Sequence, residues 1–341
     1  MSRESGGPQG GRRGGVAWAS LLPYLRILRV DHWTKNVFVL PGLLLAAFLR
    51  PDASPLPGLG ATLQVIAATC LVASANYSIN EYLDAPFDRL HPVKYQRPAV
   101  DGQVKGAWVL LQWLLLAAAG ITLAWRGQPG AGICAGLLWL MGIVYNVPPL
   151  RSKDLPYLDV LSEAVNNPLR LGIGWFTVLP LRFPPLSLII AYWMLGAFFM
   201  ATKRLAEYRR IADAARAAAY RPSFATYDER RLLVSLFFYA QMAALFIGVF
   251  IVRYHLELIL AIPLLALGMA WFLDIGLRTD SAAQRPEALY RSRGFALYVL
   301  GAAVLVLLLL FTRLPALYST FRVQEDMGHI LWELPEWGAG R

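Results

Sequence analysis

The sequence predicts an all-α membrane protein, and three observations carry that prediction. Hydrophobic residues make up 57% of the 341-residue chain and charged residues only 16%, against about 25% charged residues in a soluble domain. Apolar runs recur along the chain, and each run of about twenty residues is long enough to cross the hydrocarbon layer as a helix. Successive loops are also alternately rich and poor in lysine and arginine. We therefore expect one polytopic bundle of helices.

Nine membrane-spanning helices are predicted from the apolar runs. They cover residues 33–49, 60–82, 106–125, 130–147, 158–180, 186–204, 231–252, 256–277 and 294–313. The fifth is the most polar, because it contains Glu163, Asn166, Asn167 and Arg170.

These spans divide the chain into three parts. A basic, Gly-rich tail is expected to be disordered over residues 1–15, a single nine-helix membrane domain covers 16–314, and a C-terminal tail covers 315–341. Within the domain, an amphipathic helix over residues 17–30 is expected to lie in the membrane interface before the first span.

The distribution of positive charge predicts the orientation in the membrane. The N-terminal segment and the loops on its side hold 24 Lys or Arg residues, whereas the other side holds seven. Because cytoplasmic loops retain positive charge, the N-terminus is expected inside and, after an odd number of spans, the C-terminus outside. The net charge of +10 then reflects topology and affinity for anionic lipid headgroups, and nucleic-acid binding is not expected.

A cluster of polar residues closes the second predicted span. Asn80, Asp84 and Asp88 follow one another at steps of four residues, so a helix would carry them as one stripe drifting by about 40° per step. Pro86 is expected to kink or end the helix near Asp84 and to leave Asp88 on a turn. Ionisable groups at membrane depth are costly, so this cluster is a candidate functional site.

A second polar cluster lies at the start of the fifth predicted span. After Asp159 the polar positions are Glu163, then Asn166 or Asn167, then Arg170, at offsets of 4, 7 or 8, and 11 residues. These offsets keep to one helical face. Both clusters fall on the positively charged side. An alternative is that acidic residues at these span ends only pair with loop arginines.

The residue types in the two clusters indicate a particular chemistry. Carboxylate and amide oxygens suit Mg²⁺, which commonly binds through one or two carboxylates and substrate phosphates. Nearby Lys and Arg side chains can neutralise the remaining phosphate oxygens. Lys203 and Arg204, at the end of the sixth span, are candidates for this task, although Lys203 and Glu207 could equally form a helical ion pair. The reaction predicted is departure of pyrophosphate from an electrophilic carbon.

Three motifs resemble those of the UbiA superfamily of intramembrane prenyltransferases. N-E-x-x-D-x-x-x-D at residues 80–88 resembles its first aspartate-rich motif, and D-x-x-x-E at 159–163 resembles its second. Y-x-x-P-P-L-R-x-K-D at 145–154 is similar to the loop before the second motif. Glu81 stands where the family usually has Asp, and Glu163 ends the second motif. The resemblance implies a nine-helix bundle with an active-site cavity that faces the cytoplasm.

Three further stretches are similar to the decaprenyl-phosphate phosphoribosyltransferase branch of that superfamily. They are R-V-D-H-W-T-K-N at 29–36, D-R-x-H-P-x-K-x-x-R-P at 88–98 and K-R-x-A-E at 203–207. Enzymes of this branch move phosphoribose from phosphoribosyl pyrophosphate to a polyprenyl phosphate, in a pathway that supplies arabinose donors for cell walls. The alternatives are prenyl transfer from a prenyl diphosphate to an aromatic or other acceptor and, beyond these, a non-enzymatic transporter or lipid-binding protein.

The resemblance and the residue chemistry together give a set of candidate site residues, with Mg²⁺ as cofactor. Asn80, Asp84 and Asp88 are the expected metal ligands, and Asp84, Asp88, Asp159 and Lys203 the expected catalytic residues. Substrate binding is assigned to Lys35, Asn36, Arg89, Lys94, Arg97, Tyr145, Arg151, Lys153, Glu163, Asn166, Arg170 and Arg204. The expected partners are a polyprenyl lipid, a donor that carries pyrophosphate, and the inner-membrane bilayer.

Overall fold

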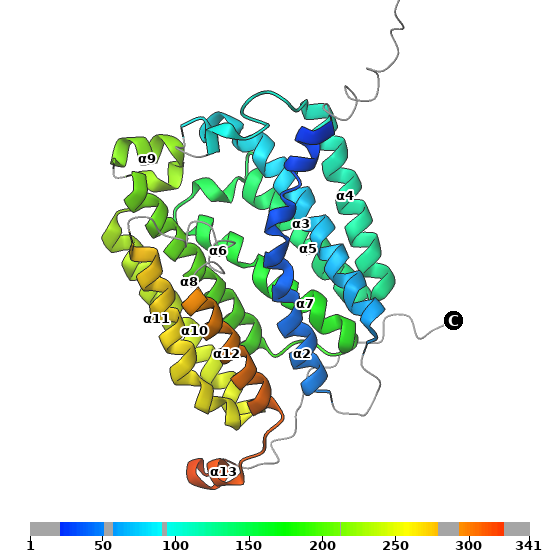
Figure 1. Cartoon of the computed structure of the whole chain (residues 1–341), viewed down its shortest axis with the longest axis vertical. Coiled ribbons are helices and arrows are strands. Elements are labelled where there is room, and N and C mark those ends of the chain that lie inside the picture. The colour runs from blue at the N-terminus through cyan, green and yellow to red at the C-terminus, as the bar shows by residue number, and fades with distance from the viewer. Residues whose placement is uncertain (1–20, 51–56, 91–93, 212, 279–292, 324–341) are drawn as a thin grey trace, which may run out of the picture.

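The structure is all-helical, as the sequence predicts. A computed structural model describes residues 21–50, 57–90, 94–211, 213–278 and 293–323. Every regular element within these ranges is a helix (Figure 1). The predicted tail over residues 1–15 and most of the tail over 315–341 lie outside the described residues.

The helices follow the predicted spans closely. In chain order they are η1 (Val30–Val39), α2 (Leu40–Phe48), α3 (Leu59–Asp88), η2 (Lys94–Gln96), α4 (Gly106–Gly127), α5 (Pro129–Asn146), η3 (Ser152–Asp154), α6 (Leu158–Ala164), α7 (Asn166–Val178), α8 (Leu186–Ile211), α9 (Ala214–Tyr220), η4 (Pro222–Ala225), α10 (Glu229–Tyr254), η5 (Leu256–Ala261), α11 (Ile262–Leu277), α12 (Arg293–Leu310) and α13 (Pro315–Phe321).

Seven continuous helices in the described part of the chain are long and apolar enough to cross a membrane, so nine continuous spans are not confirmed. The first predicted span is instead a 3-10 helix followed by the short helix α2. The fifth is divided at Val165 into α6 and α7. Pro168 follows the break, and because proline has no N–H it cannot donate to the carbonyl of Ala164, four residues earlier.

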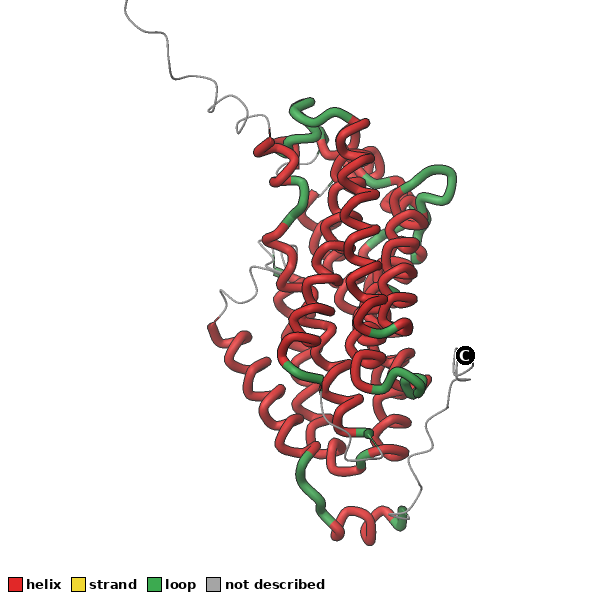
Figure 2. The backbone as a smooth tube through the Cα atoms, turned by 90° about the vertical axis from the view of Figure 1, so that its right-hand side faces the viewer, coloured by secondary structure: helices red, strands yellow, loops and turns green. Residues whose placement is uncertain are grey.

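The long helices form two packed groups around a common site. α3 packs against α4 and α5, and α2 packs against α7. On the other side, α8 packs against α10 and α11 (Figure 1). In the view turned by 90°, most of the helices run side by side along the long axis of the molecule (Figure 2). Gly174 allows α7 to pack closely against the junction of η1 and α2, since a Cβ there would lie 2.2 Å from the carbonyl oxygen of Val39.

Two local predictions near the site are corrected. α3 does not end near Asp84 but continues through Pro86 to Asp88. Pro86 has no N–H to donate to the carbonyl of Tyr82, so the helix lacks that one hydrogen bond and still continues for two more residues. The expected amphipathic helix over 17–30 is helical over residues 21–26 and is interrupted where Arg29 adopts a positive φ of 53°.

Candidate functional site

A cavity of about 670 Å³ opens between the two helix groups, and charged side chains line it. Ten are cationic, namely Arg26, Arg29, Lys35, Lys94, Arg97, Arg170, Lys203, Arg204, Arg210 and Arg221. Five are acidic, namely Asp31, Glu81, Asp84, Glu163 and Glu207. Because burying unpaired charge is costly, the excess of cations favours an anionic ligand.

Asp84 is the centre of the first motif. Its Oδ1 accepts hydrogen bonds from Nζ of Lys153 at 2.5 Å and from Nη2 of Arg151 at 2.9 Å. Asn80 Nδ2 donates to the other carboxylate oxygen at 3.2 Å. The Lys153 ammonium also donates to Oδ1 of Asn146 at 2.9 Å. Burial lowers the pKa of Lys153 to about 8, so this lysine still carries most of its charge at neutral pH.

The oxygen atoms around Lys153 have the chemistry of a hard-cation site. Its ammonium group donates to a carboxylate oxygen of Asp84 and to an amide oxygen of Asn146. Both kinds of oxygen are ligand types for Mg²⁺. No group of three His, Cys, Asp or Glu side chains that could hold a metal is found among the described residues. A Mg²⁺ ion here would therefore depend on one carboxylate, on amide oxygens and on the phosphates of the substrate.

Asp88 lies apart from the large cavity although it belongs to the same motif. Its side chain is buried and accepts a hydrogen bond from Arg97 Nη1 at 2.6 Å. With Asp84, Arg151 and Lys153 it lines a smaller cavity of about 20 Å³. The predicted stripe therefore divides between two cavities: Asn80 and Asp84 line the large one, and Asp84 and Asp88 line the smaller one. Arg97, which follows α3 in the chain, pairs with Asp88 and covers it.

The second motif divides in a similar way. Glu163, Asn166 and Arg170 line the large cavity, as predicted for substrate-binding residues. Asp159 lines neither cavity, and its side chain is fully buried. Both of its carboxylate oxygens accept hydrogen bonds from protein side chains.

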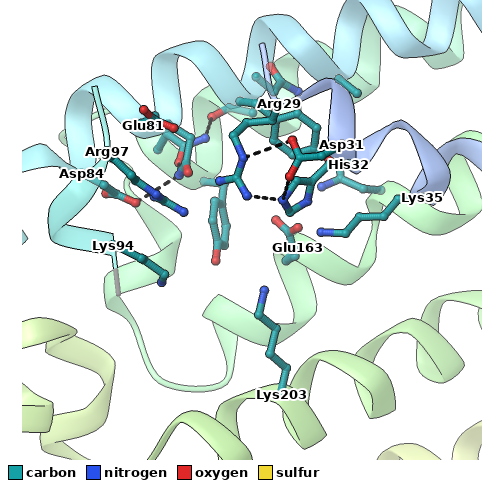
Figure 3. A pocket seen from close by; sticks show the side chains of 18 of the residues that line it. Arg29, Asp31, His32, Lys35, Glu81, Asp84, Lys94, Arg97, Glu163 and Lys203 are labelled. Atoms are coloured by element: carbon teal, nitrogen blue, oxygen red, sulfur yellow. Dashed lines mark hydrogen bonds and ion pairs between the residues drawn. The ribbon is translucent and has the colours of Figure 1, made fainter. Parts of the chain in front are cut away.

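Several other predicted cations meet in the large cavity. Lys35 reaches it from η1 and Lys203 from α8, as Figure 3 shows. Lys94 donates to Glu207 Oε1 at 3.3 Å and also contacts the Tyr220 hydroxyl. Burial acts to lower the pKa of Lys94, but the Glu207 carboxylate outweighs it and raises that pKa above its usual range.

Four predicted substrate-binding residues lie outside the lining of the large cavity: Arg151 and Lys153 line only the smaller cavity, and Arg89 and Asn36 line neither. Arg89 is exposed and lines neither cavity, because it follows α3 at the surface of the bundle. Asn36 is buried behind the wall, where its Oδ1 accepts a hydrogen bond from Arg170 Nε at 3.1 Å. Asn36 therefore contacts a cavity-lining cation and not the cavity itself.

Comparison with known proteins agrees with this geometry. The family model described as the UbiA prenyltransferase family matches residues 36–300. The chain belongs to the UbiA prenyltransferase family.

Individual UbiA relatives match the chain over shorter segments. Homogentisate phytyltransferase of Synechocystis sp. is 26% identical over 141 residues, which cover 40% of this chain and 44% of the relative. Digeranylgeranylglyceryl phosphate synthase of Methanococcoides burtonii is 31% identical over 125 residues, covering 36% of this chain and 44% of the relative. The chain thus matches less than half of the length of either relative.

A solved UbiA homologue shares the fold over most of both chains. The structure of the Archaeoglobus fulgidus homologue bound to GPP and Mg²⁺ superposes with a TM-score of 0.63 at 20% sequence identity. The match covers 83% of this chain and 99% of that one. At this identity the comparison establishes the UbiA fold.

Three residues that contribute to this UbiA site are not among the predicted site residues. Asn146 contacts Lys153, and its signal was its position at the end of the fourth predicted span. Glu207 accepts hydrogen bonds from both Lys94 and Arg204. Arg221 lines both cavities, but nothing in the sequence distinguishes it from the other arginines of the loop after α8.

Proposed function

We propose that this protein transfers phosphoribose from phosphoribosyl pyrophosphate to a polyprenyl phosphate, with loss of pyrophosphate and with Mg²⁺ as cofactor. The observation that carries the proposal is a second group of cations away from Asp84. It consists of Arg29, Lys35 and Lys203, which we call the distal cation group, and Figure 3 shows Lys35 and Lys203 extending toward the cavity from different helices.

The number of anionic groups to be bound separates this reaction from prenyl transfer. A prenyl diphosphate presents one diphosphate, and an aromatic acceptor adds at most a carboxylate. Phosphoribosyl pyrophosphate presents a diphosphate and a 5-phosphate, and the lipid acceptor adds a third anionic group. Cations on one side of the cavity would satisfy a prenyl diphosphate, whereas the distal cation group supplies the further charge that phosphoribosyl transfer requires.

The residues around Asp84 would bind the leaving group. Asp84, Asn80 and Asn146 would hold Mg²⁺, which when bound neutralises charge on the pyrophosphate oxygens. Lys94, Arg97, Arg151 and Lys153 would contact the same oxygens and stabilise the departing anion.

The transfer itself exchanges one bond at the anomeric carbon for another. The bond from this carbon to the pyrophosphate oxygen breaks, and its electron pair leaves with pyrophosphate. An oxygen of the lipid phosphate forms the new bond to the same carbon. Because that oxygen is already anionic, the acceptor does not have to lose a proton, and the distal cation group would bind both this oxygen and the 5-phosphate of the donor.

The location follows from the same proposal. A multi-pass membrane protein with its cationic site at one end of the bundle would bind soluble phosphoribosyl pyrophosphate on the cytoplasmic face of the inner membrane. The positive charge of the loops supports an N-terminus inside and a C-terminus outside.

An assay of the purified protein with two donors tests the proposal. One reaction contains Mg²⁺, labelled phosphoribosyl pyrophosphate and a polyprenyl phosphate, and the other contains Mg²⁺, a labelled prenyl diphosphate and an aromatic acid. We expect label to enter lipid only in the first reaction, with release of pyrophosphate. Transfer only in the second reaction would contradict the proposal.

Prenyl transfer is the second candidate, and family membership favours it. Relatives named as phytyl and digeranylgeranylglyceryl phosphate enzymes use the same fold family, and the Archaeoglobus homologue binds GPP with Mg²⁺. In this reaction the residues around Asp84 would keep their role with a prenyl diphosphate, and the distal cation group would have no phosphate to bind.

A further inference from the structure

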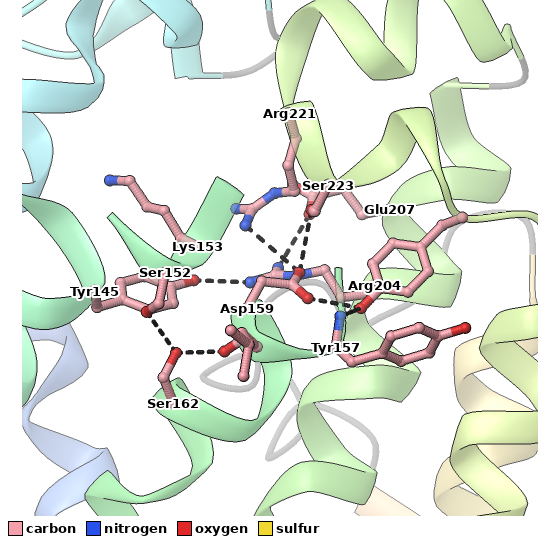
Figure 4. Close-up of polar contacts among 12 residues, drawn as sticks. Tyr145, Ser152, Lys153, Tyr157, Asp159, Ser162, Arg204, Glu207, Arg221 and Ser223 are labelled. Carbon is pink, nitrogen blue, oxygen red and sulfur yellow. Dashed lines mark hydrogen bonds and ion pairs between the residues drawn. The ribbon is translucent and has the colours of Figure 1, made fainter. Parts of the chain in front are cut away.

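The acidic residue that begins the second motif is turned away from the cavity. Asp159 Oδ2 accepts hydrogen bonds from Arg204 Nε at 3.0 Å and from Ser223 Oγ at 3.3 Å (Figure 4). Its Oδ1 accepts one from the Tyr227 hydroxyl at 2.7 Å. With a side-chain exposure of 0%, the carboxylate has no oxygen open toward the cavity.

Two of the groups around Asp159 come from the segment after α8. We call residues 213–227, which include α9 and η4, the cap. Ser223 and Tyr227 belong to the cap, and Arg221 of the cap lies with its Nη1 3.9 Å from Asp159 Oδ2. Tyr227 packs edge to face against Tyr157, and Phe224 packs edge to face against Tyr208 of α8, so the cap is fixed to the bundle at this point.

The two arginines beside Asp159 are themselves part of the cavity wall. Arg204 lines the large cavity and donates to Glu207 Oε2 at 3.2 Å and to the Tyr145 hydroxyl at 3.0 Å. Arg221 lines both cavities. Within the described chain, its buried Nε atom makes no hydrogen bond, whereas Nη1 faces Asp159. Buried donors are normally satisfied, so the Nε atom points to a ligand that accepts from Arg221.

We propose that Asp159 is a positioning residue and not a metal ligand: it holds Arg204 and the cap residue Arg221 at the cavity wall, where both contact the diphosphate of the donor. The inference rests on the proposed function in one respect, namely that the cavity binds a diphosphate. It assigns the two acidic motifs different tasks, since Asp84 serves the metal while Asp159 orients the cations.

Two ligands measured separately test this assignment on the purified full-length protein. Mn²⁺ binding is followed by electron paramagnetic resonance, and pyrophosphate binding by calorimetry in the presence of Mg²⁺. For Asp159→Asn we expect pyrophosphate affinity to fall roughly tenfold to a hundredfold, as for losing charge-assisted hydrogen bonds. Mn²⁺ affinity should change by less than about tenfold, the lower limit for losing an outer-sphere partner.

Asp84→Asn is the matched variant, since it removes the same charge from the other motif. We expect it to weaken Mn²⁺ binding by more than about a hundredfold, beyond the usual range for outer-sphere partners. Hydrogen exchange of cap peptides should accelerate in Asp159→Asn and stay unchanged in Asp84→Asn. A change in fold stability alone would not separate metal from pyrophosphate binding in this way.

Other results would overturn the inference. Loss of Mn²⁺ affinity in Asp159→Asn equal to that in Asp84→Asn would make Asp159 a ligand. Unchanged pyrophosphate affinity would mean that it positions nothing. If Asp159→Asn does not fold, Arg221→Gln replaces it, and unchanged pyrophosphate affinity there contradicts the inference. Failure of the unmodified protein to bind pyrophosphate would instead refute the proposed function and this inference with it.

Discussion

The two acidic motifs resemble each other in sequence but differ in exposure to the cavity. Each begins with polar residues at the end of a membrane segment and lies beside a basic loop. Asp84 of the first motif lines the large cavity, whereas Asp159 of the second is enclosed by Arg204, Ser223 and Tyr227. A charge pattern therefore locates a site without showing which carboxylate faces the ligand.

Removing the charge of Asp84, the carboxylate that lines the large cavity, should lower activity the most. We expect Asp84→Asn to lower kcat/KM by about a thousandfold or more, because it removes both the metal charge and the partner of Lys153 and Arg151. The measurement is transfer of labelled phosphoribose by variant and unmodified protein at matched concentrations. Turnover within tenfold of the unmodified protein would show that the reaction does not depend on this carboxylate.

An exposed aspartate provides the control for that substitution. Asp274 pairs with Arg278 on the surface of α11, and its side chain is 59% exposed. Asp274→Asn should leave transfer unchanged, since exposed pairs one helical turn apart contribute only a few tenths of a kcal/mol to stability. A large loss in this variant would mean that the assay reports general damage to the protein.

A cation that belongs to neither motif extends the comparison. We expect Lys203→Met to raise the KM for phosphoribosyl pyrophosphate by about a hundredfold, because a charge-assisted phosphate contact contributes up to about 3 kcal/mol. Methionine keeps most of the apolar stem of lysine. Initial rates are measured over a range of donor concentrations. If the KM changes less than threefold, the distal cation group does not bind the donor.

The remaining aspartate of the first motif should matter less than Asp84. Asp88 lies outside the large cavity and pairs with Arg97 at 2.6 Å. We expect Asp88→Asn to lower kcat/KM by roughly tenfold, because Arg97 loses a charged partner but remains in the cavity wall. The same transfer assay measures it. A loss as large as that of Asp84→Asn would place Asp88 in direct contact with the metal or substrate.

The sequence was sufficient for features that depend on neighbouring residues. Apolar runs identified where the long helices begin, although α3 and α8 extend beyond the predicted spans to Asp88 and Ile211. Residue type identified the cavity-lining Asp84, Glu163 and Lys203. The division of the fifth span at Val165 was not predicted, because the length of the apolar run masks the local effect of Pro168. Continuity of a helix depends on each local hydrogen bond as well as on overall composition.

The burial of Asp159 could not be predicted, because its partners are distant in sequence. Arg204 lies 45 residues away, Ser223 64 and Tyr227 68. Only the packing of α6 against α8 and the return of the cap bring them together. The pattern D-x-x-x-E specifies two carboxylates one helical turn apart, and the surrounding helices decide that Glu163 faces the cavity while Asp159 does not.

The smallest expected effect separates the charge of Asp159 from its hydrogen bonds. Tyr227→Phe removes a hydroxyl that donates to Asp159 Oδ1 at 2.7 Å and accepts from the backbone N–H of Tyr157 at 2.5 Å. We expect the unfolding free energy to fall by about 1 to 3 kcal/mol, measured by denaturation in detergent. Pyrophosphate affinity should fall less than about threefold, because the charge that attracts both arginines remains. A loss equal to that of Asp159→Asn would mean that the tyrosine hydroxyl, and not the buried charge, holds the cap over the site.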